Sequence, residues 1–165
     1  MGKTWIRMLT TGLTLGIMVL IFCFSSQPAE KSDAASGIIA EKTADVLRPD
    51  WRKMKARERK AYYDEINYVV RKCAHYTEFT LLGFSLRMCL ESWLEKKRGL
   101  GPAAWAGAAL YAALDESHQM LVDGRSAQIR DVMIDSGGVL TGVLLAGLTI
   151  RMIGKHIHFE QEEHA

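Results

Sequence analysis

The stretch LYAALDESHQMLVDGRSAQIRD, residues 110–131, places ionisable side chains inside an apolar run. Asp115 and Glu116 follow a segment of alanine and leucine that is typical of membrane-spanning helices. A charged side chain in hydrocarbon costs at least about 2.5 kcal/mol on insertion scales, so such residues normally face one another or a polar cavity. The stretch therefore predicts a polar site inside a helical bundle.

Two other apolar stretches carry residues of the same kind. His75 and Glu78 lie near the start of one stretch, and Asp131 and Asp135 lie near the start of another. At about 100° per residue, the two members of each pair fall within about 60° of each other on one helical face. Each helix is therefore expected to present a polar stripe to its neighbours.

The residue types in these stripes allow acid/base chemistry or metal binding. An imidazole and carboxylates from three helices could form a general acid/base pair, or an oxygen-rich site for a divalent metal ion. The spacing matches no HExxH zinc motif, phosphate-binding loop or nucleophile elbow, so it assigns no reaction. The candidates for catalytic or ligand roles are His75, Glu78, Asp115, Glu116 and Asp131.

Other polar residues near the same ends of these stretches could bind a substrate. Guanidinium groups bind phosphate through paired hydrogen bonds, and a phosphorylated lipid would bring phosphate to that depth. We therefore expect the partner to be a membrane lipid or a lipid-linked wall precursor. The candidates for substrate binding are Arg71, Lys72, Gln119, Arg125 and Asp135.

Four hydrophobic stretches must position these residues. Residues 8–29 contain no charged side chain, and residues 132–150 contain only Asp135. A helix needs roughly 20 residues to cross the hydrocarbon of a bilayer. The first stretch is interpreted as a retained helix and not a signal peptide, because it is long and no A-x-A cleavage signal follows closely. We predict an all-α integral membrane bundle of four transmembrane helices at about residues 5–27, 73–94, 102–122 and 132–153.

Residues 30–72, between the first two predicted spans, have a charged, helix-forming composition interrupted at Pro49. Proline disfavours the helical conformation of the residue before it, so Arg48 should leave the helical region. We expect one or two short amphipathic helices on the bilayer surface, with these aromatic residues at headgroup depth: Trp51, Tyr62, Tyr63 and Tyr68. Residues 1–155 are thus predicted to form one membrane domain, followed by a polar tail at 156–165.

The orientation is predicted from the lysines and arginines of the short segments outside the spans. With four spans, Lys3 and Arg7, residues 96–98, and Arg151 and Lys155 fall on one side, which we expect to be cytoplasmic. Both termini are then cytoplasmic, and the polar site faces outward. The basic residues of the middle section would also lie outside, but they are mixed with acids.

The composition argues against two other classes of protein. A net charge of +2, with basic residues interleaved among acids, argues against nucleic-acid binding. Three cysteines without CxxC spacing argue against a disulfide framework and a thiolate zinc site. Within residues 132–150, Gly138, Gly142 and Ala146 recur at the four-residue spacing that lets membrane helices approach closely.

Three segments together resemble a known family: FSSQP, VVRKCAHYTEFTLLG and ALDESHQMLVDGRSAQIRDVMIDSGGVLTG. They are similar to the VanZ-like bacterial membrane proteins, whose pattern is R-K-x-A-H-x-x-E-aromatic, D-E-x-x-Q, G-R and D-x-x-x-N-x-x-G-x-x-x-G. The family usually has Asn where this chain has Asp135, which adds an ionisable group. The polar residues at matching positions are Arg71, Lys72, His75, Glu78, Asp115, Glu116, Gln119, Gly124, Arg125, Asp131 and Asp135.

The resemblance implies a multi-pass protein of the bacterial cell membrane that lowers susceptibility to teicoplanin and related lipid-bearing glycopeptides. It supplies no agreed reaction, so an enzyme and a non-catalytic binder both stay open. In the second alternative the buried charges form an interhelical network, and the bundle binds a lipid or the acyl tail of the antibiotic. His118 could be an extra ligand, and Arg87 and Glu91 are expected to form an ordinary i,i+4 ion pair.

Overall fold

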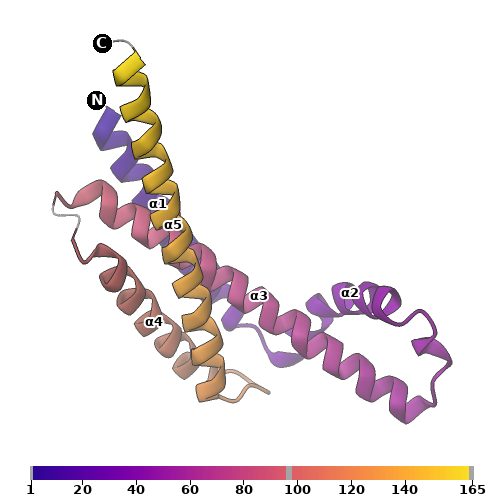
Figure 1. Cartoon of the computed structure of the whole chain (residues 1–165). Helices are drawn as coiled ribbons and strands as arrows, with labels where there is room; N and C mark the ends of the chain where they lie inside the picture. The colour runs from indigo at the N-terminus through magenta and orange to yellow at the C-terminus, as the bar shows by residue number, and fades with distance from the viewer. Residues whose placement is uncertain (1, 96–97, 164–165) are drawn as a thin grey trace.

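The computed structural model describes residues 2–95 and 98–163, with side chains to residue 153. The side chains of the predicted polar tail, 156–165, lie outside the described residues. The described residues form five α-helices and one short 3-10 helix and contain no strand, so the all-α prediction is confirmed (Figure 1). In chain order the elements are α1 (Gly2–Ser25), α2 (Ala29–Leu47), η1 (Trp51–Lys53), α3 (Ala56–Trp93), α4 (Leu100–Gln119) and α5 (Ile129–Glu163).

Two of these helices contain segments long and apolar enough to cross a membrane, Gly2–Ser25 and Ile129–Ile153. The stretches 73–94 and 102–122 are also almost wholly helical, as predicted. Charged residues interrupt the first of them, and alanine and glycine dominate the second, so neither reaches the hydropathy of α1 and α5. The predicted bundle of four spans is therefore not confirmed by the helices alone.

The middle section differs from the prediction in how it joins the next helix. Leu47 ends α2, and Arg48 has φ −148° and ψ 86°, outside the helical region, as Pro49 predicts. From Ala56 onward, however, α3 runs without a break to Trp93, because that stretch contains no proline. The predicted span at 73–94 is thus the second part of a longer helix, and only α2 is a separate amphipathic helix.

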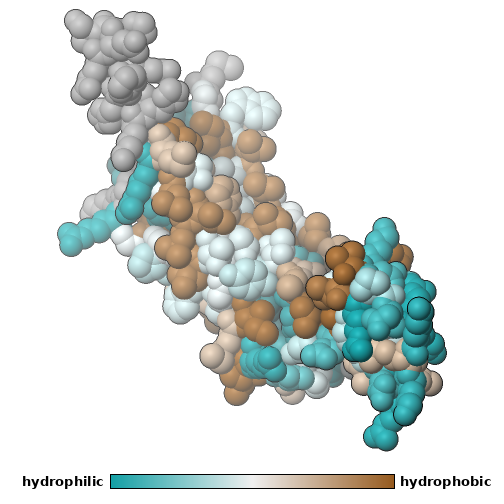
Figure 2. Space-filling view, turned by 45° about the vertical axis from the view of Figure 1, so that its right-hand side comes forward, coloured by the Kyte–Doolittle hydropathy of each residue, from teal (hydrophilic) through white to brown (hydrophobic). Residues whose placement is uncertain are grey.

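The first part of α3 projects from the bundle together with α2 (Figure 1). The two helices pack through small residues of α2, since Gly37, Ala40 and Ala44 are buried. Figure 2 shows hydrophilic residues gathered over this projecting end, whereas hydrophobic residues cover much of the bundle on the same face. Polar groups of the projecting part are therefore free to contact water or headgroups.

The bundle itself is built on close contact between α3 and α5. A Cβ added at Gly142 would overlap the backbone oxygen of Thr80, and one added at Gly138 would overlap the backbone oxygen of Tyr76. Ala146, the third member of the predicted seam, is completely buried. The prediction that these small residues let two helices approach closely is confirmed.

The two ends of the bundle differ in chemistry. At one end, Arg7 of α1 donates a hydrogen bond from Nε to the carbonyl of Ser92 at 3.0 Å, close to the end of α3. The ion pair of Arg87 with Glu91, 3.0 Å long, lies in the same part of α3 and confirms the i,i+4 prediction. At the opposite end, the end of α1, the end of α4 and the start of α5 come together around the middle of α3 (Figure 1). The candidate residues lie there.

Candidate functional site

Asp115 joins α4 to α1 through a buried hydrogen bond. Its side chain lies in the last turns of α4 and is only 4% exposed. Ser25, the last residue of α1, donates to Asp115 Oδ2 at 2.6 Å, and Gln119 Nε2 donates to the same oxygen at 3.0 Å. Asp115 Oδ1 is buried, with no hydrogen-bond partner among the described residues. Ser25 was not predicted as a site residue, although it lies within the FSSQP motif.

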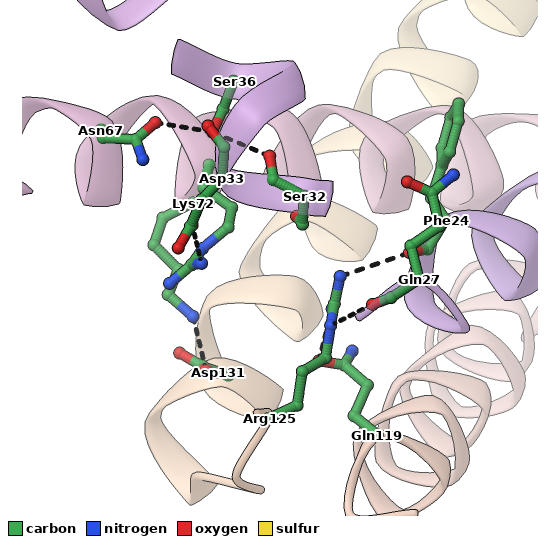
Figure 3. A network of polar contacts seen from close by, with 11 residues as sticks. Phe24, Gln27, Ser32, Asp33, Ser36, Asn67, Lys72, Gln119, Arg125 and Asp131 are labelled. Carbon is green, nitrogen blue, oxygen red and sulfur yellow. Dashed lines mark hydrogen bonds and ion pairs between the residues drawn. The ribbon is translucent and has the colours of Figure 1, made fainter. Parts of the chain in front are cut away.

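Arg125 lies between α4 and α5 and reaches back to the end of α1 (Figure 3). It donates to the carbonyls of Gln27 at 2.9 Å and Phe24 at 3.3 Å, and to Gln119 Oε1 at 3.0 Å. All three acceptors are neutral, and none of the described carboxylates pairs with this guanidinium. Burial lowers the pKa of Arg125 from its ordinary value, and the nearby charge of Arg71 lowers it further. That ordinary value is so high that the guanidinium remains protonated.

The two basic residues at the centre of α3 each face a carboxylate from another element. Lys72 Nζ lies 2.5 Å from Asp131 Oδ2 at the start of α5, as Figure 3 shows. Arg71 Nη1 lies 2.5 Å from Asp33 Oδ1 on α2. Asp33 was missed by sequence reasoning, because it belongs to a section with mixed charges that reads as a solvated surface. The polar site therefore extends beyond the bundle to α2.

Glu116 and Asp135 are also buried, being 4% and 3% exposed. Glu116 Oε1 accepts a hydrogen bond of 2.7 Å from the backbone N–H of Gln128, just before α5. The sequence left open which of Asp115 and Glu116 faces inward. Both do, since Asp115 points to α1 and Glu116 points to the segment that begins α5. The second carboxylate thus fixes the connection between α4 and α5.

His75 and Glu78 line a groove of about 390 Å³ between the end of α1, α2 and α3. A smaller polar cavity of about 100 Å³ contains Lys72, His75 and Asp131 in its lining. Arg71, His75 and Arg125 line both spaces. These three side chains therefore form the boundary between the groove and the polar cavity.

The structure gives little support to His118 as an extra ligand or to a site for a divalent metal ion. The ring of His118 packs against Phe22, with 4.7 Å between ring centroids, instead of joining the hydrogen bonds of Asp115. Across the part of the chain that the structure describes, no three His, Cys, Asp or Glu side chains are grouped to share a metal ion. Basic side chains line both open spaces, beside the buried carboxyl groups.

Comparison with models of protein families identifies the family of this chain. A family model described as VanZ/LLP1 matches residues 11–150. The chain belongs to the VanZ/LLP1 family. The matched residues include α1 from Thr11, the whole of α2, α3 and α4, and most of α5, so the VanZ/LLP1 domain contains Ser25 and every predicted site residue. No curated protein and no solved structure gives a significant match to the chain.

Proposed function

We propose that this VanZ/LLP1 protein crosses the bacterial cell membrane four times, through α1, the second part of α3, α4 and α5. Both termini would be cytoplasmic, and the polar site would lie at the outer leaflet. Two observations support this topology. The start of α1 and the end of α5 lie toward the same end of the molecule (Figure 1), and the polar site lies toward the other.

The proposed activity is lowered susceptibility to teicoplanin-type lipoglycopeptides, through a site that binds or acts on a phosphorylated lipid or a wall-precursor lipid. The observation that carries this proposal is the shared boundary formed by Arg71, His75 and Arg125. On one side of them lies a groove with apolar walls, and on the other a polar cavity. A lipid phosphate needs this combination, since its chain is apolar and its headgroup is anionic.

Two mechanisms are compatible with this proposal. In an enzyme, His75 and Glu78 would exchange protons with the lipid, while Asp115, Glu116 and Asp131 would orient the reacting groups. In a binder, the same carboxylates would act only in the structural contacts described above. Turnover of a phospholipid or polyprenyl-phosphate pool would indicate the enzyme, and stoichiometric lipid in the purified protein would indicate the binder.

The first test is antibiotic susceptibility in a bacterial host that expresses the protein. We expect Glu78→Gln to abolish protection against teicoplanin without lowering the amount of protein in the membrane, because it removes an ionisable group from the groove. Glu65→Gln is the matched control, since Glu65 is an exposed residue of the same helix. Protection that is equal in wild type and Glu78→Gln would contradict a role for this carboxyl group in the proposed activity.

A further inference from the structure

We infer that the lipid held at this site has a headgroup little larger than one phosphate, with one chain in the groove and the phosphate between Arg71 and Arg125. This inference rests on the proposed function and narrows its substrate class. It selects a simple lipid phosphate over a wall precursor that carries a disaccharide and a peptide.

The groove is suited to a hydrocarbon chain. Phe24, Ile39, Val70 and Ala74 contribute apolar side chains to its lining. Its volume of about 390 Å³ lies within the roughly 300–1,000 Å³ of small-molecule sites. Such a groove can hold a hydrocarbon chain without any specific polar contact.

The polar cavity has a surplus of positive charge in its lining. Three of its lining residues are cationic, Arg71, Lys72 and Arg125. Lys72 pairs with Asp131 and Arg71 pairs with Asp33, so Arg125 is the cation without a carboxylate partner among the described residues. A guanidinium carries five N–H donors, and Arg125 uses three of them on neutral oxygens. The remaining donors and the uncompensated charge match an anionic group at the boundary with the groove.

The size of the cavity limits the group that can enter. Measured as space open to the centres of water molecules, the cavity has about 100 Å³, whereas one bound water needs roughly 10–15 Å³ by this measure. It therefore holds several water molecules. A phosphate group is of this order of size, whereas a disaccharide bearing a peptide is many times larger. The cavity therefore accepts the phosphate but cannot enclose the disaccharide and its peptide.

The wall of the cavity is held in place, so it does not readily widen. The backbone N–H of Ala29 donates to the carbonyl of Asp123 at 3.2 Å, and this contact ties the start of α2 to the segment after α4. The next residue, Gly124, has φ +74°, and a Cβ added there would lie 3.1 Å from the side chain of Ala29. With the bond between Glu116 and the Gln128 backbone, these contacts fix the segment that lines the cavity.

The test is calorimetric titration of the full-length protein in a neutral maltoside detergent, which supplies chains without phosphate. The probes are dodecyl phosphate, inorganic phosphate and a polyprenyl-linked disaccharide-peptide. We expect dodecyl phosphate to bind at least about tenfold more tightly than either other probe. Inorganic phosphate has no chain for the groove, and the disaccharide-peptide headgroup exceeds the cavity. Equal binding of inorganic phosphate would overturn the assignment of the groove to the chain.

Two variants of α3, each with an alanine replaced by tryptophan, distinguish occupation of the groove from general damage to the fold. Ala74→Trp places a large side chain in the groove and should weaken dodecyl phosphate binding at least about tenfold. Ala61→Trp, at an exposed position in the projecting part of α3, should bind as wild type does. Equal affinity of the two variants would contradict the inferred position of the chain.

The outcomes for the inference and for the proposed function can be told apart. If the disaccharide-peptide lipid binds as tightly as dodecyl phosphate, the headgroup assignment is wrong and the proposed function stands. If dodecyl phosphate binds as expected but Glu78→Gln still protects against teicoplanin, the lipid site stands and the proposed role of Glu78 fails. If no phosphorylated lipid binds, both are overturned.

Discussion

Replacement of Gly142 by alanine tests the contact on which the site depends. A Cβ at this position overlaps the backbone oxygen of Thr80 and lies 2.7 Å from the backbone nitrogen of Phe84. Both neighbours are backbone atoms and cannot rotate away, so α5 must move away from α3. Overpacking costs about 1–3 kcal/mol, and the rigid neighbours place this site near the upper value. The alanine regains up to about 1 kcal/mol of helix stability, which leaves a net loss of about 2 kcal/mol.

Gly147→Ala is the matched control, because Gly147 lies on the same helix and has no atom within 4 Å of an added Cβ. It should gain up to about 1 kcal/mol, so the two variants should differ by about 3 kcal/mol. For a chain of this length, that difference corresponds to about 6–12 °C in melting temperature. The assay is thermal unfolding of both purified proteins in the same detergent. Equal melting temperatures would refute the argument that the glycine seam sets the distance between α3 and α5.

Two further predictions concern polar contacts outside the spanning segments. Arg125→Lys should lower the free energy of unfolding by about 1.5–3 kcal/mol, because an ammonium cannot make the three separated hydrogen bonds of the guanidinium. Melting curves should show this loss. The control Arg130→Lys, at an exposed position, should melt as wild type does. Hydrogen bonds from Arg52 and Trp51 lower the pKa of Asp45 below its ordinary value of 3.8. The contribution of these contacts to the stability of the folded protein is therefore complete above that pH and is lost as the pH falls through the lowered pKa. Fluorescence titration should detect a transition of Trp51 below about pH 4 that Asp45→Asn abolishes, and an unchanged titration in that variant would contradict the pairing.

Several features of the site follow from the sequence because they depend on one helix at a time. The apolar runs predicted α1 and α5, and Pro49 predicted the end of α2. Helical spacing placed Asp131 and Asp135 on a common face, and both are buried. The length of α3 was underestimated, because a change from charged to apolar residues does not end a helix that contains no proline.

The sequence by itself determined the helical class, the resemblance to VanZ-like proteins and the residue types of the site. Only the tertiary structure decided their partners. It paired Asp115 with Ser25 and Arg71 with Asp33, and it placed Arg125 against the end of α1. The reason is that helical periodicity fixes where side chains lie around one axis, whereas the rotation of one helix relative to another depends on packing. In this protein that rotation is set where the α5 glycines meet the backbone of α3.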